Sequence, residues 1–223
     1  MGIVCSNHSD INGKAYMEDR QISIASVNQV MCLDDSAPPM AFFGVYDGHS
    51  GQDCAEFVRL NLHNHIFSDI DALVSDPQTT LKKAFAACDK SFLRSATEDS
   101  EQIVYSGSTA TAAFFLQSTV YVAGVGDSRA VLARQGRAMD LTTDHVPTIQ
   151  SETERIHRAG GSVVRGRVQG VLGVSRAFGD IEFKLLKEKS WGSEFAADLI
   201  SVEPEICVVE IQPEDEFIII ASD

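Results

Sequence analysis

Residues 40 to 49 read Met-Ala-Phe-Phe-Gly-Val-Tyr-Asp-Gly-His, an apolar run that passes directly into an acidic turn. The apolar and aromatic residues from Met40 to Tyr46 predict a buried β-strand. Asp47-Gly48-His49 then places a carboxylate and an imidazole at the end of that strand, where a rigid backbone can hold both side chains toward solvent. An Asp-Gly pair after a strand is by itself most often only a turn. The rest of the sequence must therefore decide whether this one carries chemistry.

Further strands are predicted in the middle of the chain. Thr109 to Leu116 and Thr119 to Gly124, joined by Gln117-Ser118, predict a β-hairpin. Arg129 to Ala133, which ends before the turn-forming pair Gln135-Gly136, would add a third strand. We therefore expect an antiparallel meander here.

The end of the chain repeats this pattern. Glu205 to Ile211 and Glu216 to Ala221 have the apolar, β-branched composition of strands. Between them lie Pro213-Glu-Asp215, residues that favour a turn. A second strand pair is therefore predicted.

Apolar residues at helical spacing predict three helices. The clearest follows Asp76-Pro77 and places four apolar residues on one face, at Leu81, Phe85, Cys88 and Phe92. A second, from about Ser50 to Phe67, does the same with Cys54, Val58, Leu62 and Ile66. The third, near Ser151 to Ala159, has a predicted capping box of Ser151 with Glu154 and ends at Gly160-Gly161.

The order of these elements indicates the fold class. The predicted order is a strand, a helix pair, a meander, a helix and a strand pair. This order lacks the strict alternation of strand and helix that a doubly wound parallel sheet requires. An α+β fold with helices packed outside antiparallel sheets is therefore expected. Because no linker rich in Pro, Gly or Ser divides the chain, residues 1–223 are expected to form a single domain.

The composition excludes some partners. The chain has 32 acidic and 18 basic residues, a formal net charge of −14, which would repel the phosphate backbone of nucleic acids. The five cysteines are widely spread and indicate free thiols in a reducing compartment. No apolar run approaches the ~20 residues of a membrane helix. We expect a monomer located in the cytoplasm, the nucleus or both.

The N-terminus allows two interpretations. Met1-Gly-Ile-Val-Cys-Ser6 fits the pattern for N-myristoylation, with Cys5 as a second lipid site. The alternative is a buried first strand from Ile3 to Ser6. Membrane association is expected only if Gly2 is lipidated.

Four acidic clusters stand at strand ends or turns. They contain Glu18-Asp19, Asp47, Asp127 and Asp223. Hard divalent cations such as Mg²⁺ and Mn²⁺ prefer carboxylate and carbonyl oxygens together with retained waters, and a pair of such ions can activate a bridging water. Carboxylates from four separate segments would suit a site of this kind. Each cluster alone is better explained as a turn or a solvated loop.

Several motifs taken together resemble the metal-dependent protein serine/threonine phosphatases of type 2C. The resemblance extends over nearly the whole chain and rests on motifs in the family's order: Lys14-Ala-Tyr-Met-Glu-Asp19, Phe43-Gly-Val-Tyr-Asp-Gly-His-Ser-Gly51, Ser106-Gly-Ser-Thr-Ala110, Gly124-Val-Gly-Asp-Ser-Arg-Ala130, Leu141-Thr-Thr-Asp-His145, Glu154-Arg-Ile156 with Ala159-Gly-Gly161, Val174-Ser-Arg-Ala-Phe-Gly-Asp180 and Ile219-Ile-Ala-Ser-Asp223. It implies a four-layer α/β/β/α sandwich of two antiparallel sheets flanked by helices, with a two-metal site at one end.

The resemblance also implies a set of metal ligands. Asp47 would bridge two Mg²⁺ or Mn²⁺ ions, and the backbone carbonyl of Gly48 would bind one of them. Asp223 would bind the other. Glu18 and Asp19 would complete the shell directly or through waters. The implied reaction is hydrolysis of phosphoserine and phosphothreonine in phosphoprotein substrates by a metal-bridging water.

Three more residues receive roles from the resemblance. His49 would be the general acid that protonates the leaving alkoxide, and Asp127 would help to hold a third, weaker metal ion. Lys14 stands where the family often has an arginine that binds the substrate phosphate. Lysine keeps the charge but lacks the bidentate guanidinium, which predicts weaker or less directional phosphate binding.

The end of the sequence is a second departure from the family. The family continues after the position of Asp223 with further helices and a last Asp ligand, so the catalytic domain is expected to be truncated at its C-terminus. The alternative function is a catalytically inactive pseudophosphatase that acts as a binding module. A two-metal nuclease is disfavoured by the charge of −14 and by the absence of a basic stripe in the sequence.

Overall fold

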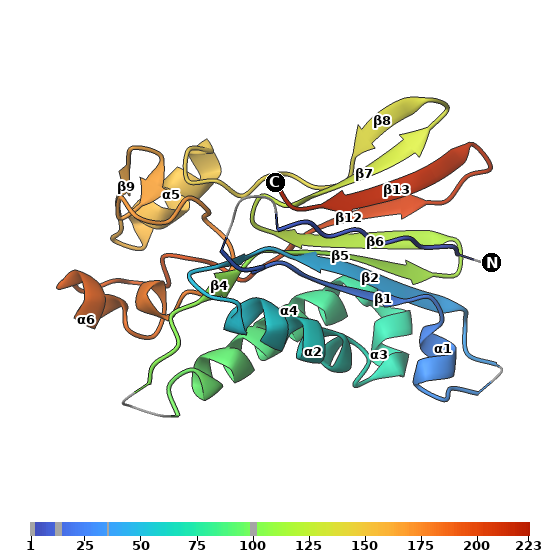
Figure 1. Cartoon of the computed structure of the whole chain (residues 1–223), viewed down its shortest axis with the longest axis horizontal. Coiled ribbons are helices and arrows are strands. Elements are labelled where there is room, and N and C mark those ends of the chain that lie inside the picture. Colours follow the sequence, from blue (N-terminus) through green and yellow to red (C-terminus); the bar gives the residue numbers. More distant parts are fainter. Residues whose placement is uncertain (1–2, 12–14, 35, 99–101) are drawn as a thin grey trace.

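Two antiparallel β-sheets lie face to face in the computed structural model, which describes residues 3–11, 15–34, 36–98 and 102–223 (Figure 1). The larger sheet has the strand order β1 (Arg20–Ile24), β2 (Met40–Tyr46), β5 (Ala110–Leu116), β6 (Thr119–Val125) and β12 (Glu205–Glu210). The smaller has the order β13 (Asp215–Ala221), β7 (Arg129–Arg134) and β8 (Arg137–Asp140). The expected antiparallel α+β architecture is confirmed.

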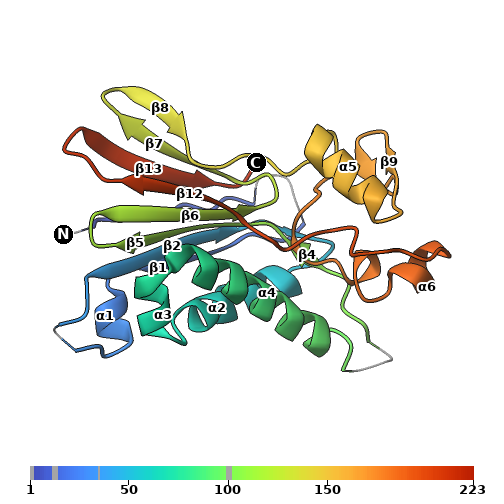
Figure 2. The same cartoon turned by 180° about the vertical axis from the view of Figure 1, so that it is seen from behind.

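Four helices cover the outer face of the larger sheet, as both views show (Figures 1 and 2). They are α1 (Val27–Val30), α2 (Asp53–Ile66), α3 (Ile70–Ser75) and α4 (Pro77–Ser95). Helix α4 begins as the sequence predicts, because the Asp76 side chain accepts a hydrogen bond from the Thr79 amide and Pro77 occupies the first turn. Both predicted apolar stripes are buried.

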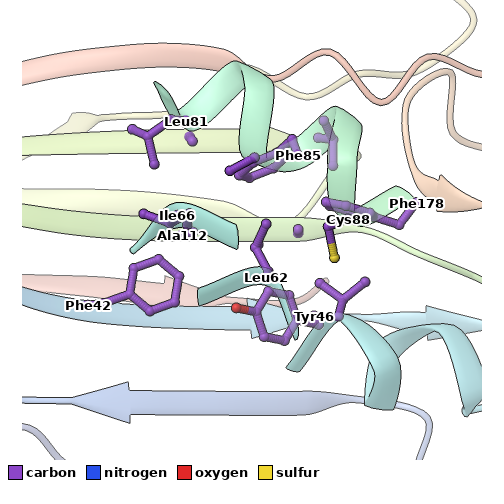
Figure 3. Packing of buried hydrophobic residues seen from close by; sticks show 14 of the residues in the cluster. Phe42, Tyr46, Leu62, Ile66, Leu81, Phe85, Cys88, Ala112 and Phe178 are labelled. Carbon is purple, nitrogen blue, oxygen red and sulfur yellow. The ribbon is translucent and has the colours of Figure 1, made fainter. Parts of the chain in front are cut away.

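The main core lies between these helices and the larger sheet (Figure 3). Phe42 and Tyr46 of β2 are fully buried against Leu62 of α2. The ring of Phe85 in α4 packs in a tilted arrangement against that of Phe178, with the ring centroids 5.2 Å apart. Aromatic pairs of this kind add about 0.5–1.5 kcal/mol to the stabilisation from burial. The core therefore fixes the segment around Phe178 against helix α4.

The predicted hairpin is confirmed, but the predicted meander is wrong. β5 and β6 pair through the Gln117-Ser118 turn, where Gln117 has a φ of 54°. Strand β7 does not pair with β6; it pairs with β8 and β13 in the other sheet. Its buried residues Ala130 and Leu132 pack against the inner face of the larger sheet. The chain thus crosses from one sheet to the other between β6 and β7.

The last two strands are also separated. β12 pairs with β6 in the larger sheet, whereas β13 pairs with β7 in the smaller one. The predicted pairing of these two strands is therefore wrong, although both strands exist. An ion pair between Arg134 and Asp215 fixes the start of β13 beside β7.

A lobe of short elements follows β8 at one end of the sandwich. It contains α5 (Gln150–Arg158), β9 (Val163–Val164), β10 (Arg167–Val168), the 3-10 helix η1 (Ile181–Phe183) and α6 (Lys187–Trp191). A second small core, which includes Ile156 and Phe183, holds the lobe together. The predicted helix at α5 exists, but the capping box does not, because Ile149 is the N-cap and no side chain caps the helix.

The N-terminal segment differs from one of the two interpretations of the sequence. Ile3 to Ser6 form no strand, and Val4 is 98% exposed, so the alternative of a buried first strand is wrong; Gly2 lies outside the described residues. No helix in the described part of the chain covers the outer face of β13, β7 and β8, where Phe217 and Ile219 are each 55% exposed. The described residues thus form two packed sheets with helices on the outer face of the larger one. No helix within the described ranges is both long and apolar enough to span a membrane.

Candidate active site

The candidate site lies at the end of the sandwich that faces the α5 lobe, where the chain also reaches Asp223 (Figure 1). After β2, the chain enters β3 (Gly48–His49), which pairs with β4 (Gly107–Ser108); β4 in turn pairs with β11 (Phe178–Gly179). The Asp47 backbone is fixed on both sides by Thr109, whose amide donates to the Asp47 carbonyl at 2.9 Å and whose hydroxyl accepts from the Asp47 amide at 3.2 Å. Asp47 is therefore held on a rigid sheet end.

Three carboxylates from distant segments meet at this point. The carboxylates of Asp19 and Asp223 lie near that of Asp47, close enough for both to raise its pKa. The hydroxyl of Ser222 donates to Asp19 Oδ2 at 3.0 Å, which joins the segment after β13 to the segment before β1. Burial, the charge of Asp19 and the contact with Asp223 raise the pKa of Asp47 to about 7. The structure thus brings together three of the residues named from the sequence.

Glu18 and Gly48 lie beside this cluster. Glu18 Oε1 accepts a hydrogen bond of 2.8 Å from the amide of Gly51. The backbone carbonyl of Glu18 approaches Gly48 so closely that a Cβ there would stand 2.6 Å from its oxygen. Gly48 therefore lets the Glu18-Asp19 segment lie against the end of β2.

Lys14 lies outside the described residues. Asp127 lies near the same cluster. Burial and the charge of Asp223 raise the pKa of Asp127 above its ordinary value, while His49 acts in the opposite direction. Asp127 is thus within electrostatic range of Asp223 and His49. Its neighbour Ser128 accepts or donates a hydrogen bond with Thr109 at 2.8 Å, which links this turn to the Asp47 backbone.

His49 has a partner to which the sequence assigned no role. Its Nε2 lies 2.8 Å from Oδ1 of Asp180, a residue that is only 3% exposed. Burial lowers the pKa of His49, but the charge and hydrogen bond of Asp180 outweigh it and raise the pKa above its ordinary value. The signal available in the sequence was the position of Asp180 at the end of the motif Val174-Ser-Arg-Ala-Phe-Gly-Asp180. Nothing in the spacing indicates that this aspartate would meet His49.

The donor set fits a hard divalent cation. Its groups are carboxylate and backbone oxygens, and carboxylates as close as Asp19, Asp47 and Asp223 repel one another unless protons or cations neutralise them. Within the described parts of the chain, no three His, Cys, Asp or Glu side chains by themselves close around one point as a metal shell. A donor set that leaves room for water suits Mg²⁺ or Mn²⁺, because such ions usually keep several waters and bind only one or two carboxylates each.

Comparison with curated proteins identifies relatives of this chain. The chain is 38% identical over 216 residues to "Probable protein phosphatase 2C 22" of Arabidopsis thaliana, a match that covers 96% of this chain and 54% of the relative. It is 40% identical over 184 residues to "Protein phosphatase 2C homolog 2" of Hypocrea jecorina, covering 82% of this chain and 40% of the relative. The chain spans about half the length of the curated relatives it matches.

Solved structures share the fold of this chain, and a family model identifies the family. A C. elegans sex determining protein superposes with a TM-score of 0.73 at 26% identity, covering 92% of this chain and 48% of that one. A serine-threonine phosphatase 2C from Toxoplasma gondii superposes with a TM-score of 0.76 at 22% identity, covering 95% and 74%, and supports the fold alone. The family model "Protein phosphatase 2C" matches residues 6–223. Because this match takes in nearly the whole chain, the chain belongs to the protein phosphatase 2C family.

Proposed function

We propose that this chain is the metal-dependent catalytic part of a protein serine/threonine phosphatase, which hydrolyses phosphoserine and phosphothreonine in proteins. Metal dependence on Mg²⁺ or Mn²⁺ is general in the family. The observation that carries the proposal is the meeting of Asp19, Asp47 and Asp223 at one sheet end, although they come from segments far apart in the chain. A purely structural site would gain nothing from three crowded carboxylates.

The residues around Asp47 would hold the ions. Asp47, Asp223 and the Gly48 carbonyl would hold Mg²⁺ or Mn²⁺ ions, with Asp47 shared between two of them. Glu18 and Asp19 would bind directly or through waters, and Asp127 would help to hold a third, weaker ion. When bound, the ions supply an activated water and neutralise the charge of the phosphoryl group.

His49 would act on the leaving group. A serine or threonine alkoxide leaves poorly, so the oxygen must receive a proton as its bond to phosphorus breaks. The side chain of His49 is 25% exposed, which lets it reach a bound substrate from a fixed position beside Asp47. Lys14 would bind the phosphate of the substrate.

The test is phosphate release from a phosphothreonine peptide by the full-length protein with Mn²⁺ or Mg²⁺. We expect hydrolysis that a chelator abolishes and that Asp47→Asn lowers at least about 100-fold, because the substitution removes the bridging carboxylate. Asp140→Asn is the matched control, since Asp140 is exposed on β8, in the smaller sheet. Undiminished activity of Asp47→Asn, or an inactive wild-type protein with metal bound, would overturn the proposal. The second result would instead favour the inactive binding module.

A further inference from the structure

We infer that Asp180 is the positioning residue for His49: it holds the imidazole ring in the orientation from which the proton is delivered. The inference rests on the proposed function, because it takes His49 as the proton donor. Among the described residues, Asp180 is the side chain to which the His49 ring is hydrogen bonded, through Nε2 and Oδ1 at 2.8 Å. This contact fixes the plane of a ring that could otherwise rotate about its side-chain bonds.

Asp180 is itself held in an unusual conformation. Its φ and ψ are 54° and 53°, in the left-handed region, which Asp tolerates better than most residues but adopts infrequently. Its amide donates to the Ser106 carbonyl at 3.2 Å, next to β4. This backbone conformation directs the carboxylate at the end of β3, where His49 lies. Strain of this kind persists where the surrounding structure fixes it and is concentrated at functional sites.

A buried ion pair anchors the segment that carries Asp180. The amide of Gly179 donates to Asp89 Oδ1 at 2.8 Å, and Lys184 Nζ donates to Asp89 Oδ2 at 2.7 Å and to the Ala177 carbonyl at 2.9 Å. Asp89 and Lys184 are only 4% and 2% exposed. Asp89 of helix α4 therefore binds the chain on both sides of Asp180, through Gly179 and Lys184. These buried contacts fix the position of the Asp180 carboxylate.

Gly107 keeps space for the His49–Asp180 pair. A Cβ on Gly107 would stand 2.3 Å from His49 Nε2 and 2.5 Å from both carboxylate oxygens of Asp180. No side chain other than hydrogen fits there without displacing the pair. The backbone of β4 therefore forms one wall of the contact and keeps the two side chains together.

One oxygen of Asp180 argues against a purely structural role. Oδ2 is buried and has no hydrogen-bond partner among the described residues. A buried polar atom without a partner costs about 1–3 kcal/mol. A carboxylate that served only to stabilise the fold would leave this cost uncompensated, whereas one that orients a reacting group need not have both oxygens bonded within the protein.

The test compares two substrates of the full-length protein. A phosphothreonine peptide needs a proton on its leaving oxygen, whereas p-nitrophenyl phosphate releases a stable phenolate and does not. Asp180→Gly removes the carboxylate without backbone strain, because glycine adopts a φ of 54° freely. We expect kcat on the peptide to fall by about 10- to 100-fold and kcat on p-nitrophenyl phosphate by less than about threefold. Asp180→Asn keeps an oxygen acceptor and should recover part of the loss.

Two controls separate positioning from folding. Combined with His49→Gln, Asp180→Gly should cause no further loss on the peptide, because a residue that acts through His49 has nothing left to position. Glu152→Gln alters another buried carboxylate, in α5, and should change stability without changing the ratio of the two activities. Equal losses of Asp180→Gly on both substrates, or additive losses in the double variant, would refute the inference while leaving the phosphatase intact. A wild-type protein inactive on both substrates would refute both proposals.

Discussion

Gly48 illustrates how a single position brings the acidic segments together. It follows Asp47 directly, and a Cβ there would stand 2.6 Å from the Glu18 carbonyl oxygen and 3.2 Å from the Ala55 side chain. Because the first of these neighbours is backbone, it cannot turn aside as a flexible side chain would. The absence of a side chain at Gly48 is thus what allows the Glu18-Asp19 segment to lie beside Asp47.

Gly48→Ala should therefore separate the carboxylates. The added methyl group must push the Glu18 backbone away, and displacements of this size in a reacting site lower rates by about 10- to 100-fold. We expect such a loss in Mn²⁺-dependent hydrolysis of a phosphothreonine peptide by the full-length protein. Gly173→Ala is the control, because its Cβ would meet Arg167 Nη1 at an ordinary 3.6 Å, and it should remain within about twofold of wild type. An active Gly48→Ala would contradict this account of the close approach.

The site residues differ in how far the sequence could predict them. Glu18, Asp19, Asp47 and Asp223 stand at strand ends and inside motifs, so the sequence named them before the structure placed them. Asp180 received no role, because it lies 131 residues from His49 and the two meet only through the pairing of β3, β4 and β11. Tertiary contacts of this range leave no trace in the spacing of residues.

At the scale of elements, the sequence predicted strands better than it predicted their partners. Alternating and apolar runs located β2, β5, β6, β7, β12 and β13. The apolar pattern of β7 fits two positions equally well, beside β6 in the same sheet or in the facing sheet. Both positions would bury Ala130 and Leu132. The inner faces of two packed sheets share one core, and local periodicity does not distinguish them. Both wrong pairings have this origin.

Helix α5 supplies a prediction about pH. Glu152 is 2% exposed and lies between Arg176, at 2.7 Å, and Arg155, at 3.1 Å. Burial alone would raise the pKa of Glu152, but the hydrogen bonds and charges of the two arginines outweigh it and hold the pKa below the ordinary value of 4.5. The ionised carboxylate thus stabilises the folded state above that pH, and this contribution is lost as the pH falls further.

Glu152→Gln should reveal this dependence in urea unfolding. At pH 7 the variant should have a lower free energy of unfolding than wild type, because it leaves two arginines without their shared carboxylate. The difference should shrink as the pH falls below about 4.5, where the glutamate of the unfolded wild-type chain begins to be protonated while that of the folded state is still ionised. A difference of the same size at pH 7 and at pH 3.5 would mean that the ion pairs do not cause it.

At the scale of the whole molecule, the two sheets of the sandwich hold the acidic residues together at one end. The larger sheet carries Asp47, the smaller sheet leads to Asp223, and the segment before β1 brings Asp19. The buried pair of Asp89 and Lys184 ties the same end to helix α4. In a chain of net charge −14, concentrating carboxylates at one point is unfavourable unless cations bind there. The fold and the charge distribution therefore agree with a cation-binding site at this end.

Calorimetric titration of the full-length protein with Mn²⁺ tests this claim most directly, because it needs no substrate. We expect binding at two sites in the wild-type protein and at least about tenfold weaker binding in Asp47→Asn, while Asp140→Asn should bind as wild type does. Absence of Mn²⁺ binding to the folded wild-type protein, or unchanged binding by Asp47→Asn, would contradict the account.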